Sequence, residues 1–381
     1  MDTEPLRIGL IGYRGFGAFC TETFHRTEQG RVVAFAGRDA QAMAETALRY
    51  GVPKTYTDWR ALVADPDVEM VHIVTPPDKH AEMAVAALEA GKHVLVEKPL
   101  ATSEDGAQAI LDAARRAGRV AGINYVMRYN PLYQAVARIA REGWLGGLTH
   151  VGFENYASDE GLGDAHWFWD KGQSGGIFVE HGVHFFDVIG DIVGAPARRV
   201  LGQTWERADG TGKEDRVQAI ITYGNGIEAS FYHAFNRPGA LERQNAHFAF
   251  EKGHVTLDGW IPHTLHLSAI AGEGDLLGLR RLLPVNIVDD EDFPPPGRAV
   301  RGNGKEYRVT HRVHARERLG DPTPVYQQAV RDVLLDLAAA VRDPAHRPRV
   351  SAVDGAASLR VALAAKRSAE MGRAVEIGRE E

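Results

Sequence analysis

The 381-residue sequence is poor in cysteine, in clustered positive charge and in long apolar runs. Its single cysteine, Cys20, excludes an internal disulfide and a metal cluster built on several thiolates. The formal net charge is −7 and there is no basic run, which argues against nucleic acid or an anionic membrane as a partner. No apolar stretch reaches the roughly 20 residues that a membrane-spanning helix needs.

Length and composition place the chain among ordinary globular proteins. Hydrophobic residues make up 44% and charged residues 25% of a chain that is too long for one small core. Met1 to Arg7 is polar and leads straight into a strand, so we expect no export signal and a cytoplasmic location. The simplest expectation is a protein of two domains.

Strand-like and helix-like segments alternate from Arg7 to about Asn124, which is typical of an α/β domain with a parallel sheet. We therefore place a first domain at residues 1–124 and a second at residues 125–381. Strand-like runs from His150 onward, joined by turns such as Gly224-Asn225-Gly226, predict a mainly antiparallel sheet there. Helices are expected over residues 131–141, 325–341 and 354–371, with the last packing back on the body, and residues 272–307, with Pro294, Pro295 and Pro296, are expected to be irregular.

The first strand ends in a glycine-rich turn, and a helical segment follows it. Gly12 permits a tight turn, Gly17 permits close packing of helix on strand, and the helix N-terminus offers free N–H groups to a pyrophosphate. Arg14 stands where the middle glycine of a dinucleotide fingerprint is usual, and Gly15 is an extra glycine. The turn predicts a dinucleotide site with an imperfect fingerprint.

The second strand ends at Gly37-Arg38-Asp39, where an acid usually accepts hydrogen bonds from the adenosine ribose. Gly37 occupies the expected acid position, and Arg38 is suited to pair with a 2′-phosphate. Stacking on adenine or simple solvation is the alternative for Arg38. Asp39 is expected to cap the next helix. This pattern favours NADP, with NAD as the alternative.

A later strand, Val94-Leu95-Val96, ends abruptly in Glu97-Lys98-Pro99. Ligands of open α/β sheets gather at the carboxyl ends of strands, so Glu97 and Lys98 are placed for chemistry. A lysine at the floor of a cleft is suited to polarise a hydroxyl group. The alternative is a solvated turn.

The stretch from Gly175 to Asp187 carries a second polar group. If its latter part is helical, Glu180, His184 and Asp187 lie on one face, and Glu180 would orient His184 for proton exchange near neutral pH. A metal site and a core histidine are the alternatives. The aromatic group from His166 to Trp169 is suited either to a sugar ring or to a hydrophobic core.

Five stretches together resemble the glucose–fructose oxidoreductase/inositol dehydrogenase/rhizopine catabolism (Gfo/Idh/MocA) family. In chain order they are Gly12–Gly17, Thr75-Pro76-Pro77 with His80, Glu97-Lys98-Pro99, Asn124–Pro131 and Gly175–Asp187. The resemblance implies an N-terminal Rossmann domain and a C-terminal α/β domain with a large open, mostly antiparallel sheet. It also implies a homodimer or homotetramer joined through that sheet.

The resemblance implies roles for particular residues. Lys98 is similar to the family's catalytic lysine, His184 to its acid/base histidine, and Glu97 to the partner of the nicotinamide ribose. Glu180 stands where aspartate is common, and this departure and Arg14 leave their local geometry open. The cofactor is expected to contact Gly12, Tyr13, Arg14, Gly15, Phe16, Gly17, Arg38, Thr75, Pro76, His80, Glu97 and Lys98, and the substrate Asn124, Arg128, Trp169, His181 and His184, with no metal.

The sequence therefore predicts an NAD(P)-dependent dehydrogenase acting on a secondary alcohol of a sugar, cyclic polyol or glycoside. Lys98 would stabilise the alkoxide, His184 would take the proton, and Glu180 would orient His184. One alternative is a glycoside hydrolase that recycles NAD through oxidation and elimination, and another is a non-catalytic NAD(P)-binding sensor.

Overall fold

A computed structural model describes residues 4–288, 293–294 and 298–378 of the chain. The chain divides into two compact units. The first consists of Met1–Tyr129, Asp164–Asp187 and Gln327–Leu363, and the second of Asn130–Gly163, Val188–Tyr326 and Ala364–Glu381.

The first unit is built on a six-stranded parallel sheet. Its strand order, β3-β2-β1-β4-β5-β6, reverses direction between β1 and β4, which is the doubly wound arrangement of dinucleotide-binding domains. The ligand position in this arrangement lies beyond the carboxyl ends of the strands. The strands are β1 (Leu6–Ile11), β2 (Gly30–Ala36), β3 (Lys54–Tyr56), β4 (Met70–Ile73), β5 (His93–Val96) and β6 (Ala121–Ile123).

Side-chain caps fix the starts of several helices in this unit. Asp39, Asp58 and Ser103 each accept a hydrogen bond from a backbone N–H of the first turn that follows. The predicted cap at Asp39 is therefore confirmed. The helices between the strands are α1 (Phe16–His25), α2 (Ala40–Tyr50), α3 (Trp59–Ala64), α4 (His80–Glu89) and α5 (Glu104–Ala117), with the 3-10 turns η1 (Pro77–Lys79) and η2 (Val126–Tyr129).

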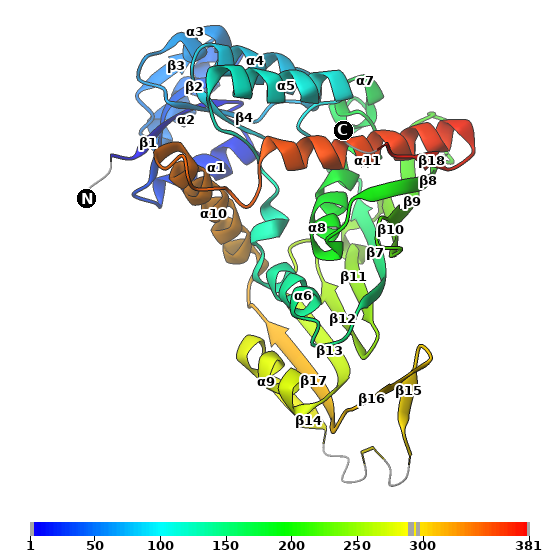
Figure 1. Ribbon diagram of the computed structural model, residues 1–381. Coiled ribbons are helices and arrows are strands. Elements are labelled where there is room, and N and C mark those ends of the chain that lie inside the picture. The colour runs from blue at the N-terminus through cyan, green and yellow to red at the C-terminus, as the bar shows by residue number, and fades with distance from the viewer. Residues whose placement is uncertain (1–3, 289–292, 295–297, 379–381) are drawn as a thin grey trace. The chain divides into compact units, whose positions relative to one another are not determined.

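A helix from the distant end of the chain, α10 (Pro322–Arg342), completes this core. A Cβ atom at Gly30 would lie 2.7 Å from Leu334, and one at Gly122 would lie 2.6 Å from Leu337, so both leucine side chains pack closely on the glycine backbone. In Figure 1, α10 lies beside α1, whereas α4 and α5 run along the other side of the sheet. The side chain of Arg26, just after α1, is hydrogen-bonded to Gln327 at 3.4 Å, in agreement with this placement.

Residues 164–187 also belong to the first unit. They form η3 (Trp167–Trp169), α7 (Lys171–Ser174), the π-helical turn η4 (Phe178–Gly182) and the start of α8 (Val183–Val193). The boundary predicted near Asn124 lies shortly before the break at Tyr129, but this segment and residues 327–363 return to the first unit. Hydrophobic periodicity shows that a helix has an apolar face, but it does not show which core that face joins.

The second unit holds a ten-stranded sheet in the order β14-β17-β13-β12-β11-β7-β10-β9-β8-β18. All neighbours are antiparallel except β7 and β10, so the prediction of a large, mostly antiparallel sheet is confirmed. Phe153 and Phe231 meet on its buried face with ring centroids 6.3 Å apart. The strands are β7 (Leu148–Ser158), β8 (Ala197–Glu206), β9 (Glu214–Tyr223), β10 (Glu228–Arg237), β11 (Arg243–Phe250), β12 (Gly253–Asp258), β13 (Thr264–Ala271), β14 (Val285–Val288), β17 (His311–Arg318) and β18 (Val375–Glu376).

Besides the later part of α8, further helices belong wholly or partly to this unit. They are α6 (Pro131–Glu142), α9 (Glu273–Leu282) and α11 (Ala352–Met371), whose second half contacts β8 through a hydrogen bond from Gly202 N–H to Ser368. The prediction that residues 272–307 are irregular is wrong, because α9, β14, β15 (Val300–Gly302) and β16 (Lys305–Tyr307) form there. Pro295 and Pro296 of the predicted triple proline lie outside the described residues.

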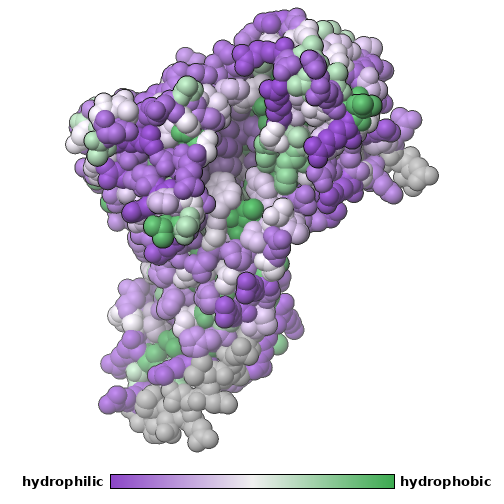
Figure 2. All heavy atoms as spheres, turned by 180° about the vertical axis from the view of Figure 1, so that it is seen from behind, coloured by the Kyte–Doolittle hydropathy of each residue, from purple (hydrophilic) through white to green (hydrophobic). Residues whose placement is uncertain are grey.

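Hydrophilic side chains dominate the face of the molecule in Figure 2, and hydrophobic atoms form small, separate patches there. Among the described residues, no helix combines the length and the apolar character needed to cross a bilayer.

Candidate active site

The glycine-rich turn after β1 has the geometry predicted for a pyrophosphate cradle. Gly12 has φ +100°, and a Cβ atom there would lie 2.0 Å from the carbonyl oxygen of Val74. A Cβ atom at Gly17 would lie 1.9 Å from the carbonyl oxygen of Gly12. Gly15 caps α1 without a side chain, so the first N–H groups of the helix, beginning at Phe16, have no side-chain cap.

The Tyr13 ring fills the space beside Gly37, the position at which a ribose-binding acid is usual. A Cβ atom at Gly37 would lie 2.5 Å from the Tyr13 ring, whose hydroxyl donates to the carbonyl oxygen of Asp39 at 3.1 Å. Arg14 forms an ion pair of 2.5 Å with Asp39, and the backbone N–H of Ala42, together with Arg14, lowers the pKa of Asp39. Arg38 is exposed and has no ion pair with another described residue.

The turn after β4 contains Thr75 and Pro76 and leads through η1 into α4. The first residue of α4, His80, is completely buried, with Nε2 2.8 Å from the carbonyl oxygen of Thr75 and Nδ1 2.7 Å from that of Pro99. The ring has no exposed surface and both nitrogens are engaged within the protein. Direct contact of His80 with the cofactor, as the sequence suggests, stays a prediction.

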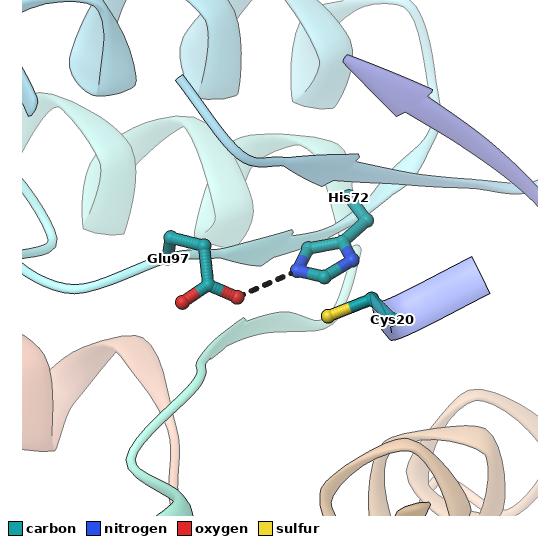
Figure 3. Close-up of side chains that lie close together, drawn as sticks. All are labelled: Cys20, His72 and Glu97. Carbon is teal, nitrogen blue, oxygen red and sulfur yellow. Dashed lines mark hydrogen bonds and ion pairs between the residues drawn. The ribbon is translucent and has the colours of Figure 1, made fainter. Parts of the chain in front are cut away.

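Glu97, directly after β5, is held by a buried polar network. Its Oε1 accepts hydrogen bonds from His72 Nε2 at 2.9 Å and Asn124 Nδ2 at 2.7 Å. Figure 3 shows Cys20 beside the His72 ring, and the candidate ligand atoms of Cys20, His72 and Glu97 lie within 4.8 Å of one another. Burial, and secondarily the charge of Glu97, raises the pKa of the Cys20 thiol.

The group of Cys20, His72 and Glu97 has the residue types of a metal site. However, His72 already hydrogen-bonds Glu97, and the raised thiol pKa favours the protonated form rather than the thiolate that metals bind. We therefore interpret the group as a hydrogen-bonded support for Glu97, which lies next to Lys98.

The ammonium group of Lys98 is bound by one residue through two acceptors. Its Nζ donates to the carbonyl oxygen of Glu180 at 2.9 Å and also to the Glu180 carboxylate. Only 19% of the Lys98 side chain and 10% of the Glu180 side chain are exposed. Lys98 and Glu180 belong to the same compact unit, so this contact forms within that unit.

His184 lies in the first turn of α8, and His181 lies in η4. Both are buried; their ring centroids are 6.2 Å apart, and the Tyr125 ring lies 6.1 Å from that of His184. The expected single face of Glu180, His184 and Asp187 assumed regular α-helical spacing. The π-helical turn changes this spacing, and the Glu180 carboxylate accepts a hydrogen bond from Lys98.

Arg128 is engaged by two carboxylates. Its guanidinium forms two hydrogen bonds with Asp187, of 2.8 and 2.6 Å, and one of 3.1 Å with Asp354. Only 11% of the Arg128 side chain is exposed. Its predicted role in substrate binding remains untested and would require this network to open. Trp169 is partly exposed in η3, where its ring meets Phe168 edge-on at 5.0 Å.

Sequence reasoning did not single out several buried polar residues. His72 could have been noticed, because it interrupts the apolar strand Met70–Ile73. In the second unit, Asn155 is paired with His233 on one neighbouring strand and with Gln244 on the other. All three are buried, and Gln244 donates to Asn155 at 2.9 Å. Polar residues at inward positions of the strands were the available signal.

Two family models match successive parts of the chain. Residues 6–125 match the model of the oxidoreductase family with an NAD-binding Rossmann fold. Residues 133–256 match the GFO/IDH/MocA C-terminal domain. The chain belongs to the Gfo/Idh/MocA oxidoreductase family.

Characterised relatives support this Gfo/Idh/MocA assignment. The chain is 31% identical to 1,5-anhydro-D-fructose reductase of Ensifer adhaerens over 60% of this chain and 69% of that protein. It is 29% identical to levoglucosan dehydrogenase of Pseudarthrobacter phenanthrenivorans over 66% of this chain and 70% of that protein. The predicted class, a nicotinamide-dependent oxidoreductase with sugar and polyol dehydrogenases among its relatives, is confirmed.

Solved structures support the fold. An oxidoreductase domain protein from Kribbella flavida superposes with a TM-score of 0.79 at 24% identity, covering 99% of this chain and 100% of that one. Levoglucosan dehydrogenase in complex with NADH gives a TM-score of 0.78 at 20% identity, with coverage of 99% and 100%. The predicted Rossmann domain followed by a domain with a large antiparallel sheet is therefore confirmed.

Proposed function

We propose that this enzyme transfers a hydride between a secondary alcohol of a sugar or cyclic polyol and C4 of a bound nicotinamide. The bond between Lys98 and Glu180 carries the proposal, because it fixes an ammonium group at the carboxyl end of β5. This is the ligand-binding edge of the Rossmann sheet. His184 follows Glu180 closely in the chain and supplies a group that exchanges protons near neutral pH.

The residues divide the reaction between them. His184 takes the hydroxyl proton, and Lys98 stabilises the alkoxide oxygen that develops as the hydride leaves. Glu180 holds the Lys98 ammonium group in place. Asn124, Trp169 and His181 remain candidate substrate contacts. The bound nicotinamide accepts the hydride, which is chemistry that the cofactor itself supplies.

A substrate panel tests this proposal. Purified enzyme is mixed with sugars, inositols and glycosides and with either NAD or NADP, and the absorbance of the reduced nicotinamide is followed. Oxidation of a sugar or polyol that disappears in Lys98→Met supports the proposal. Release of an aglycone without net reduction of the nicotinamide would indicate the hydrolase instead, and cofactor binding without turnover would indicate a sensor.

We also propose that NADP is preferred to NAD. Gly37 offers no carboxylate to the ribose, Tyr13 fills the space beside it, and the exposed Arg38 guanidinium is suited to a 2′-phosphate. The negative charge of Asp39 would repel a 2′-phosphate, and the ion pair of Asp39 with Arg14 reduces this repulsion. Calorimetric titration with both oxidised cofactors measures the preference directly.

We propose further that the enzyme is a cytoplasmic homodimer or homotetramer joined through the open face of the ten-stranded sheet. Leu201 and Ile220 are paired on the neighbouring strands β8 and β9, and their side chains are 46% and 38% exposed. Along most of both strands, buried residues alternate with exposed or half-exposed ones, so these two side chains lie on the face opposite the core. Association of two copies would cover them. Light scattering on the wild type and on Leu201→Glu tests this: a wild-type monomer at micromolar concentration contradicts it.

A further inference from the structure

His80 connects two turns that come from different strands. Its ring lies between the carbonyl oxygen of Thr75, after β4, and that of Pro99, after β5, at 2.8 and 2.7 Å. The residue has no exposed surface, so water does not compete for either contact. Thr75 begins the turn that leads into α4, and Pro99 directly follows Lys98.

The partners of His80 determine what its ring must do. A carbonyl oxygen only accepts hydrogen bonds, and a neutral imidazole carries one N–H group. Both contacts are hydrogen bonds only if both ring nitrogens are protonated. A neutral ring would place a nitrogen lone pair against a carbonyl oxygen in a buried site, which is unfavourable.

The surroundings of His80 act in opposite directions. Burial lowers the pKa of His80 below its ordinary value, and the carbonyl groups of Pro99 and Thr75 and the charge of Glu97 offset this lowering only in part. The two short distances are satisfied together by the doubly protonated ring alone. The doubly protonated ring is the form in which no nitrogen lone pair faces a carbonyl oxygen.

We infer that His80 is a positioning residue whose two ring N–H groups hold the Lys98-Pro99 turn and the Thr75-Pro76 turn in register. The inference rests on the proposed function in one respect: it takes the first turn to carry the catalytic lysine and the second to contact the nicotinamide cofactor. The bond to Pro99 then acts on the chemical step, and the bond to Thr75 acts on cofactor binding.

Two substitutions separate the two bonds. The amide nitrogen of asparagine in His80→Asn takes the place of Nδ1, so the bond to Pro99 is kept and the bond to Thr75 is lost. The amide nitrogen of glutamine in His80→Gln takes the place of Nε2, so the opposite bond is kept. His80→Asn should mainly raise the KM for the cofactor, and His80→Gln should mainly lower kcat, each by about tenfold, as expected for one buried hydrogen bond.

Matched controls are available in the same sheet. His93 begins β5 at the end remote from Lys98, and its Nδ1 accepts a hydrogen bond from Val120 N–H at 3.0 Å. His93→Asn and His93→Gln should lower the melting temperature without splitting KM from kcat. Equal changes of both parameters in the two His80 variants, following the loss of melting temperature, would show a merely structural role and overturn the inference.

A second measurement needs neither a variant nor a substrate. Neutron diffraction on the wild-type protein at neutral pH locates the ring hydrogens, and we expect one on each nitrogen of His80. A bare nitrogen overturns the inference. If the wild type oxidised nothing in the substrate panel, the proposed function would fail. The neutron result, with cofactor Kd values for the two variants, would still decide whether His80 holds the turns.

Discussion

The turns after β2 and β5 lie at the same edge of one sheet but are built differently. After β5, Glu97 is held by His72 and Asn124, Lys98 by Glu180, and the Pro99 carbonyl by His80. After β2, Arg38 is exposed and Asp39 forms an ion pair with Arg14 that is open to solvent. The first turn is fixed in advance by buried contacts, whereas the second leaves charged groups free to respond to a ligand.

This difference suggests a division of work. Catalysis gains from groups that are already in place when charge develops, because no reorganisation is then needed. Discrimination between cofactors that differ by one phosphate needs a cation that is accessible, because a phosphate binds through charge-assisted hydrogen bonds. Substitutions in the turn after β5 should therefore affect rate, and substitutions in the turn after β2 should affect cofactor choice.

The largest expected effect is that of Lys98→Met. It removes a charge that is needed mainly in the transition state, so kcat should fall by ~10³-fold while the Kd for the cofactor changes little. Single-turnover kinetics with a substrate deuterated at the reacting carbon measures the chemical step. Lys92→Met is the control, because Lys92 also donates to buried carbonyls, of Asp65 and Val68, but at the other end of the sheet. An unchanged rate in Lys98→Met would place the active site elsewhere.

His184→Ala should have the next largest effect. Loss of the general base should lower kcat by ~10²-fold and abolish the pH dependence near neutrality, leaving activity that rises with hydroxide concentration. The double variant with Lys98→Met should be little worse than Lys98→Met, since residues that act as a unit are not additive. His346→Ala, which breaks an ion pair with Asp336 in the same unit, should leave the pH profile intact. A retained neutral-pH inflection in His184→Ala would assign the proton transfer to another group.

Arg38→Ala tests the turn after β2 and should have a moderate effect. The Kd for NADP should rise about tenfold and that for NAD by less than about twofold, because one charge-assisted contact with the 2′-phosphate is lost. Arg31→Ala, an exposed arginine near the beginning of β2, serves as the control in calorimetry. Equal weakening of both cofactors would mean that Arg38 stacks on adenine instead.

Gly37→Asp should have the smallest effect on cofactor choice. The new side chain meets the Tyr13 ring, so its carboxylate should not reach the ribose, and the ratio of NADP to NAD affinity should change by less than about threefold. Combining it with Tyr13→Ala should open the space and shift the ratio towards NAD. A strong shift in Gly37→Asp alone would show that Tyr13 moves aside easily.

Much of the fold was predictable because local signals agreed with tertiary structure. The glycines at positions 12 and 17 are required by contacts with Val74 and with each other, and Asp39 caps the helix that it was expected to begin. The helix α9 was mistaken for irregular chain. Its interior glycine, Gly278, weakens the helical signal, although the Trp144 ring lies where a side chain would otherwise project.

The site was only partly predictable for a geometric reason. Lys98 and Glu180 could be named individually, but Glu180 lies in a π-helical turn and contacts Lys98, and a residue pattern read with α-helical spacing shows neither feature. The ties of Arg128 to Asp187 and Asp354 join three distant parts of the chain. Spacing within one segment carries no information about such pairs.

The packing of α10 on the Rossmann sheet has a consequence for biosynthesis. Leu334 and Leu337 fill positions against Gly30 and Gly122, yet the ribosome makes these leucines roughly 200 residues after it has made the sheet. At a synthesis rate of about 5–20 residues per second, one apolar face of the sheet stays uncovered for on the order of ten to forty seconds before α10 is made. During this interval the nascent chain offers that face to chaperones and to other nascent chains, so the order of translation makes this unit dependent on protection before it can fold.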